Sequence, residues 1–158
     1  MMVLAYYDKL GDHDEYSLAQ LRSNGLTPEA TTLRQAMEIF EGVGGFELAT
    51  TFDYGDELAE AFTLSTIQDY LKEGIPVMVA WNDWGGHWQV IIGYDTMGTE
   101  TEQDDVLIMA DPYDTTDHNQ DGYVIYPAER FYYNFTMYDF FPEEELNDML
   151  FIAARPIE

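Results

Sequence analysis

The spacing of apolar residues changes after Gly74, and this change is the main indication of the fold class. Before it, the segment "TPEATTLRQAMEIFEGVGG" places Leu33, Ala36 and Phe40 three or four residues apart, which is helical spacing. After it, the chain consists largely of short apolar runs bounded by Gly, Pro and Asp, namely "PVMVAW", "HWQVIIGYD", "DVLIMADP" and "MLFIAARP". Such runs are typical of buried strands. The order predicts an α+β fold in which N-terminal helices pack on an antiparallel sheet.

Other segments complete this prediction. Residues 1–10 are expected to form a core helix and residues 14–23 a short amphipathic helix, while Gly42 is expected to end the helix of the next segment. "FELATTF" has the composition of a short strand, and "LSTIQDYLKEG" that of a helix with Ser65 as its N-cap. In "AERFYYNFTMYDFF", the first half favours a helical turn and the second half a strand.

The chain is expected to be one domain over residues 1–158. Its length is enough to bury a core, and 46% of its residues are hydrophobic. No internal repeat, low-complexity tract or linker supports a second domain. No apolar stretch approaches the roughly 20 residues that a membrane-spanning helix needs, so no membrane span is predicted.

The charge of the chain restricts its partners. Six Lys and Arg stand against 31 Asp and Glu, which gives a net charge of −25. Such a surface repels phosphate backbones and anionic lipids, so nucleic acid is not an expected partner. The same charge suits divalent cations, cationic ligands or a high-salt setting, and it favours basic or neutral peptides over acidic ones.

His87 and Asp111 are the candidate catalytic residues. "TMGTETEQDD" joins two strand-like runs as a hairpin, and an antiparallel hairpin brings the start of its first strand beside the end of its second. A carboxylate beside an imidazole fixes the tautomer and leaves the other ring nitrogen free to act. The alternative is structural: His87 bonded to backbone at a strand end, and Asp111 ending a strand before Pro112.

The same residues carry a family resemblance. "GIPVMVAWNDWGGHWQVIIGYD", followed by "DVLIMADP", resembles the second half of bacteriocin-processing-type cysteine peptidase domains, which are papain-like, and the similarity extends from about Ile67 to "MLFIAARP". The resemblance implies a papain-like fold, a peptide or protein substrate, and hydrolysis through a thioester. It further implies that His87 is the general base and Asp111 the residue that orients it.

The nucleophile of that family has no counterpart here, because the 158 residues contain no cysteine. The resemblance places the cysteine at the start of the first helix, in a Cys-Gly-Pro-Ala motif that precedes a segment like "MMVLAYY". The domain is therefore expected to be truncated just after that motif, or else to be a catalytically inactive relative that binds without cleaving. No turnover is expected from these residues alone, since Ser17, Ser23 and Ser65 do not fall at the cysteine position.

A possible calcium loop follows Asp111. "DHNQDGY" has oxygen-bearing residues at alternate positions and then a glycine, like the first half of a calcium loop, but the acidic residue that should end the loop is displaced by one. A solvated Asp- and Asn-rich turn is the alternative. Bound Ca²⁺ would be structural and would favour an extracellular setting. The candidate ligands are Asp117, Asn119, Asp121 and the carbonyl of Tyr123.

Two tryptophans near the histidine are candidates for a substrate groove. Trp84 and Trp88 flank His87 in the sequence, and aromatic walls beside an imidazole can exclude water and hold an extended peptide. Core packing is the alternative for both residues. The sequence predicts no oligomeric state.

Overall fold

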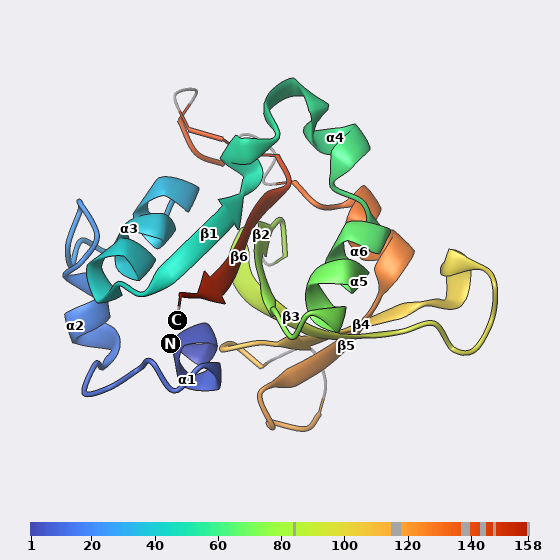
Figure 1. Ribbon diagram of the computed structural model, residues 1–158, viewed down its shortest axis with the longest axis horizontal. Coiled ribbons are helices and arrows are strands. Elements are labelled where there is room, and N and C mark those ends of the chain that lie inside the picture. Colours follow the sequence, from blue (N-terminus) through green and yellow to red (C-terminus); the bar gives the residue numbers. More distant parts are fainter. Residues whose placement is uncertain (84, 115–117, 137–139, 143–144, 147, 158) are drawn as a thin grey trace.

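A single antiparallel sheet organises the chain (Figure 1). The computed structural model describes residues 1–83, 85–114, 118–136, 140–142, 145–146 and 148–157. Its six strands lie in the order β1-β6-β2-β3-β4-β5, and each neighbouring pair is antiparallel. The strands are β1 (Phe46–Thr50), β2 (Val77–Trp81), β3 (His87–Asp95), β4 (Val106–Ala110), β5 (Tyr123–Pro127) and β6 (Leu150–Pro156).

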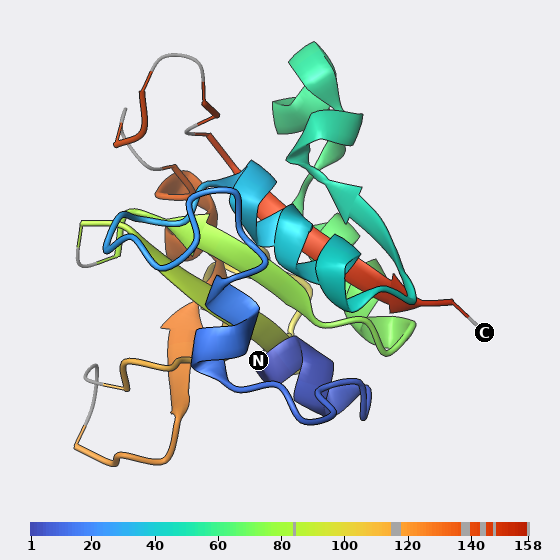
Figure 2. The ribbon, with the colours of Figure 1, turned by 90° about the vertical axis from the view of Figure 1, so that its left-hand side faces the viewer.

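Helices lie on both faces of this sheet. They are α1 (Met2–Tyr6), α2 (Glu15–Ala19), α3 (Leu33–Val43), α4 (Leu58–Ala61), α5 (Leu64–Lys72) and α6 (Ala128–Tyr133), and short 3₁₀ turns occur at Thr51–Asp53, Gly55–Glu57 and Glu102–Asp104. Figure 2 looks onto the face that carries α1, α2 and α3, where α3 runs across β6. Helices α5 and α6 lie on the opposite side in Figure 1.

Two hydrophobic clusters reflect this arrangement. On the α5 and α6 side, the buried members include Ile67, Val79, Trp81, Ile91, Met109, Phe131 and Phe151. On the α1 and α3 side, they include Leu4, Leu33, Phe40, Ala80, Val90, Leu150 and Ile152. Alternating residues of the central strands enter opposite clusters, because successive strand side chains point to opposite faces. The α+β prediction is therefore confirmed, and the structure adds that helices cover both faces of the sheet.

Two local predictions are corrected by the capping geometry. Helix α5 begins after Thr63 and not at Ser65, and the Thr63 backbone N–H donates to the hydroxyl of Thr66 three residues on. Gly42 lies within α3, close to Leu21, where a Cβ atom would come within 2.9 Å of a leucine methyl. The helix ends instead at Gly44, whose φ of +77° suits a residue without a side chain.

The predicted hairpin of β3 and β4 is present. Its register pairs Val90 with Ala110 and Asp95 with Val106, with an irregularity between Ile91 and Gly93. The strand β5 was not predicted, because its residues were assigned to the calcium loop. In the second half of the aromatic segment, residues 137–139 are outside the described part of the chain, and Thr136 forms an isolated bridge with Asp148.

Among the described residues, no helix combines the length and apolarity that crossing a bilayer requires.

Candidate functional site

The ends of β3 and β4 place His87 beside Asp111. His87 is the first residue of β3, and Asp111 follows the last residue of β4. Nε2 of His87 lies 2.6 Å from Oδ1 of Asp111. The Asp111 side chain is 1% exposed, whereas that of His87 is 13% exposed. The structure therefore brings the two candidate residues together and leaves the imidazole partly open to solvent.

The contact with Asp111 determines which ring nitrogen can act as a base. An ionised carboxylate only accepts hydrogen bonds, so Nε2 of His87 must carry the proton and donate it. Nδ1 then bears the lone pair, and it has no hydrogen-bond partner among the described residues. Within the described part of the chain, the imidazole is thus held at Nε2 and unpaired at Nδ1.

The hydrogen bonds around Asp111 keep its side chain ionised. Burial raises the pKa of this carboxyl, but hydrogen bonds from His87, from the backbone N–H of Tyr113 and from Gln89 more than offset that effect, so the pKa lies below its ordinary value of 3.8. The Tyr113 N–H donates to Oδ1 at 2.8 Å. The second oxygen, Oδ2, accepts from Nε2 of Gln89 at 3.0 Å.

Gln89 is a site residue that the sequence analysis missed. It is buried on β3, two residues after His87 and on the same face, and its amide also lies 3.3 Å from Oδ2 of Asp83. Its Oε1 accepts the indole N–H of Trp81 at 2.6 Å. The available signal was a polar residue at a strand position that otherwise enters the core, since such a residue needs partners.

A cavity of about 450 Å³ lies against the start of α1. Its lining includes Met1 and Met2 together with Trp88 and Pro112, which are the sequence neighbours of His87 and Asp111. The indole N–H of Trp88 donates to the carbonyl of Thr31 at 2.8 Å, which fixes the ring at the cavity wall. The other tryptophan of the predicted groove, Trp84, lies outside the described residues.

Tyr113 forms a further wall of the site. Its ring centroid lies 5.5 Å from that of His87, with the two planes at 83°. The tyrosine is largely exposed, so the edge-to-face contact covers one side of the imidazole without burying it.

The predicted calcium ligands are not assembled into a metal site within the described residues. Asp117 is outside them, and Asn119 lies on the described part of the loop. Oδ1 of Asp121 accepts the N–H of Tyr123 at 3.1 Å, as in an Asx turn. In the part of the chain that is described, no group of three or more His, Asp or Glu residues is placed to hold a metal ion. Calcium binding stays a prediction.

Comparison with known proteins identifies a family for this chain. The model of the Peptidase_C39 like family matches residues 1–140, a range that includes both His87 and Asp111. No curated protein and no solved structure matches the chain. Because the family model covers most of the 158 residues, this chain belongs to the Peptidase_C39 like family.

Proposed function

We propose that this domain is the base-bearing part of a papain-like cysteine peptidase site. His87 is the general base, Asp111 orients it, and Gln89 positions Asp111. The thiol nucleophile comes from a residue outside these 158, which contain no cysteine. The observation that carries the proposal is the 2.6 Å contact of His87 Nε2 with Asp111, which leaves Nδ1 to accept a proton.

The chemistry is acyl transfer from a peptide amine to water. Nδ1 of His87 takes the thiol proton, and the thiolate attacks the carbonyl carbon of the substrate. The C–N bond breaks as His87 returns the proton to the departing amine, which leaves a thioester. Water then attacks the thioester while His87 accepts its proton, and the thiol and the carboxylate product are released. Asp111 stabilises the imidazolium that forms in both stages.

The position of α1 supports a thiol on its N-terminal side. The cavity at the start of α1 also reaches Trp88 and Pro112, so the start of this helix lies close to the sequence neighbours of both catalytic candidates. Amides at a helix start lower the pKa of a nearby thiol and stabilise developing negative charge on oxygen.

The alternative is a domain that binds peptides without cleaving them. The specific observation that favours it is the lack of a cysteine within the residues that carry the base and its partner. In that case the polar network maintains the architecture of the site, and the cavities bind ligand without chemistry.

One experiment separates these two functions. The protein is isolated from its native source, and its intact mass is measured before and after treatment with iodoacetamide. A mass above 18.2 kDa with an alkylated thiol, together with peptidase activity that His87→Ala lowers by about 10²-fold or more, supports the peptidase. His13→Ala is the matched control, since that histidine contacts Ser17 at another helix. Full activity in His87→Ala would exclude the assignment.

A further inference from the structure

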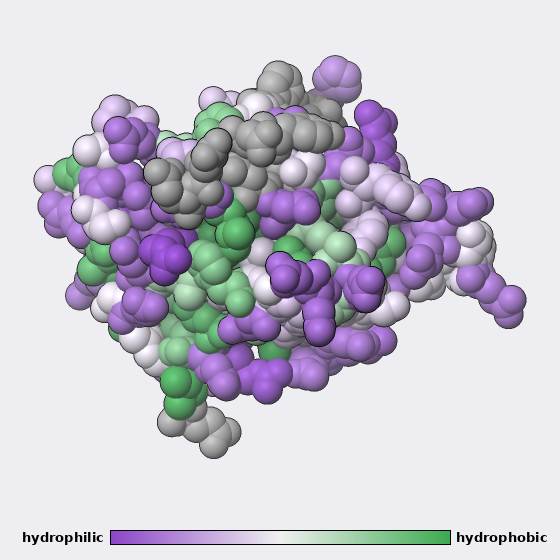
Figure 3. Space-filling model, turned by 90° about the horizontal axis from the view of Figure 1, so that it is seen from above, coloured by the Kyte–Doolittle hydropathy of each residue, from purple (hydrophilic) through white to green (hydrophobic). Residues whose placement is uncertain are grey.

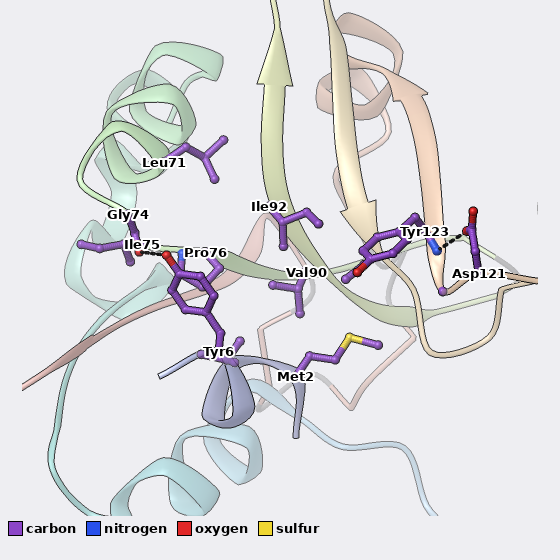
Figure 4. Close-up of a pocket in the computed structure, with 13 residues that line it drawn as sticks. Met2, Tyr6, Leu71, Gly74, Ile75, Pro76, Val90, Ile92, Asp121 and Tyr123 are labelled. Carbon is purple, nitrogen blue, oxygen red and sulfur yellow. Dashed lines mark hydrogen bonds between the residues drawn. The ribbon is translucent and has the colours of Figure 1, made fainter. Parts of the chain in front are cut away.

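A second hollow is lined by residues of α1, β3, β4 and β5, and Figure 4 shows it in close-up. This apolar groove has a volume of about 520 Å³. Its floor is made by Val90 and Ile92 of β3 with Ala110 of β4. Tyr6 of α1 and Tyr123 of β5 stand on opposite sides of it in the figure. The groove and the catalytic pair meet at one strand end, because Asp111 follows Ala110 and its N–H donates to the carbonyl of Gly122 at 2.9 Å.

Several large apolar side chains at the groove are open to solvent. Tyr6 is 61% exposed, Ile92 42% and Tyr123 51%, and the neighbouring β5 residue Ile125 is 66% exposed. The register of the sheet extends this surface, since Ile125 pairs with Ile108 of β4. Elsewhere hydrophilic side chains cover much of the molecule, as on the face seen in Figure 3. A cluster of large exposed apolar residues is characteristic of a binding surface.

The walls of the groove are already held in place. The hydroxyl of Tyr6 donates to the carbonyl of Gly74 at 3.1 Å, which ties α1 to the turn between α5 and β2. The N–H of Tyr123 donates to Oδ1 of Asp121 at 3.1 Å, which orders the start of β5. A ligand therefore meets a largely formed surface and loses little free energy in ordering it.

The charged groups at one end of the groove favour a cation. Asp121 lines this end, and Oδ2 of Asp114 accepts the N–H of Gly122 at 2.7 Å. No Lys or Arg is among the described residues that line the groove. The basic residues with described contacts are engaged elsewhere: Arg22 with Thr31, Arg34 with Phe52, Lys72 with Asp69, Arg130 with Tyr126, and Arg155 with Glu73.

We propose that this groove docks a peptide segment that combines an aromatic or branched aliphatic side chain with Lys or Arg. The apolar side chain lies on Val90 and Ile92 between the two tyrosines, and the cation faces Asp121. The inference rests on the proposed function in one respect, since it names the class of peptide on which the neighbouring catalytic pair acts. A second copy of the chain is disfavoured as occupant, because each copy carries a net charge of −25.

The test is a binding titration of the 158-residue chain, which requires no hydrolysis. The probe is acetyl-Arg-Ile-Phe-Arg-amide, and the comparison peptides are acetyl-Glu-Ile-Phe-Glu-amide and acetyl-Arg-Ser-Gly-Arg-amide. Amide NMR shifts are followed to millimolar peptide at physiological ionic strength. We expect saturable shifts at Val90, Ile92 and Gly122 with the first peptide, and weaker binding of both others. Equal binding of the acidic peptide, or shifts that avoid the groove, would overturn the proposal.

Two variants identify the contacts. Ile92→Ser is expected to weaken binding by about fivefold to tenfold through loss of apolar contact, and Ile157→Ser is its control, since that isoleucine is exposed away from the groove. Asp121→Asn is expected to weaken binding of the basic peptide by about twofold to fivefold, with Asp56→Asn as control. Unchanged binding in both groove variants would contradict the proposal.

The failures of the two proposals are distinguishable. If the chain binds the peptide at the groove but the native protein has no peptidase activity, the groove proposal stands and the peptidase proposal is rejected. If the native protein cleaves basic apolar peptides and neither Ile92→Ser nor Asp121→Asn changes that activity, the groove proposal is rejected and the peptidase proposal stands. Shifts at the groove that depend on protein concentration without peptide would indicate self-association and overturn the proposed occupant.

Discussion

The indole N–H of Trp81 donates to Oε1 of Gln89 and thereby fixes the direction of the glutamine amide. An indole nitrogen is only a donor, so the atom it meets must be the amide oxygen. The amide nitrogen of Gln89 then points toward Oδ2 of Asp111, which leaves Oδ1 to accept from His87. A residue of the core thus controls the orientation of the partly exposed imidazole through two buried side chains.

The first prediction concerns this network. Gln89→Leu leaves Oδ2 of Asp111 buried without that donor, and we expect a loss of about 1–3 kcal/mol in the free energy of unfolding. The fraction of His87 with its proton on Nε2 is also expected to fall, because Asp111 is no longer held against it. Urea denaturation measures the first effect, and nitrogen NMR shifts of the His87 ring measure the second.

The histidine measurement separates positioning from simple destabilisation. Trp81→Phe keeps most of the ring volume but removes the donor, so it is expected to shift the His87 tautomer in the same direction as Gln89→Leu. Gln103→Leu, on an exposed 3₁₀ turn, is the control and should change neither quantity. An unchanged His87 tautomer in both network variants would show that Gln89 only fills the core.

The second prediction is a pH dependence of stability. The pKa of Asp111 is lower in the folded protein than its ordinary value of 3.8, so the folded state binds fewer protons near that pH. The stabilisation is complete above the unfolded-state pKa and is lost as the pH falls through the folded-state pKa. We expect the free energy of unfolding to decrease from about pH 5 downward, and Asp111→Asn to remove part of that decrease.

Acid titration of the unfolding midpoint in urea checks this expectation. Asp56→Asn, which removes a charge from an exposed turn, controls for the change in net charge. A decrease of the same size in Asp111→Asn and in the unmodified protein would mean that other carboxyls account for the acid sensitivity.

The sequence predicts those features of the site that depend on adjacent segments, and it does not predict those that depend on contacts between distant residues. The hairpin of β3 and β4 follows from two apolar runs and a polar turn, so the approach of His87 to Asp111 was predictable. Gln89 was not, because its role requires knowing that Trp81 pairs with His87 across β2 and β3. The strand β5 was missed because the Asp-Gly before Tyr123 suits a calcium loop and a turn equally well.

The sequence also did not predict that helices would cover both faces of the sheet. The spacing of apolar residues identified α3 and α5 as helices, but each spacing defines only one buried stripe and not the sheet face against which it packs. The sides are determined by contacts distant in sequence, such as those of Phe62 with Phe135 and Phe151. Local capping was similarly ambiguous between Thr63 and Ser65, two hydroxyl residues at the start of one helix.

The third prediction tests those distant contacts. The rings of Phe62 and Phe151 stack with centroids 4.0 Å apart, and both residues are fully buried. Phe151→Ala should lower the free energy of unfolding by about 3–5 kcal/mol, because it removes the contacts and leaves a cavity. Phe140→Ala, at an exposed phenylalanine, should change it far less. Urea denaturation followed by circular dichroism compares the two variants, and equal losses would contradict the proposed core.

The fourth prediction concerns calcium. The carboxylates of Asp114 and Asp121 bond to successive backbone N–H groups, those of Gly122 and Tyr123, so both side chains turn toward the same short segment. An ion bound there would order the segment after Asp111 and add stability that grows with its concentration. For dissociation constants of about 10⁻⁴–10⁻³ M, ten millimolar calcium is expected to add about 1–3 kcal/mol.

Thermal unfolding with calcium, with magnesium and with chelator measures this effect. Calcium should raise the melting temperature, magnesium should raise it less because it demands stricter geometry, and Asp121→Asn should reduce the calcium effect. Asp56→Asn again controls for charge, since a chain with a net charge of −25 gains some stability from any divalent cation through screening. Equal shifts with both metals, unaffected by Asp121→Asn, would contradict calcium binding. The segment would then be an acidic turn whose carboxylates accept hydrogen bonds from the backbone and lie at the end of the apolar groove.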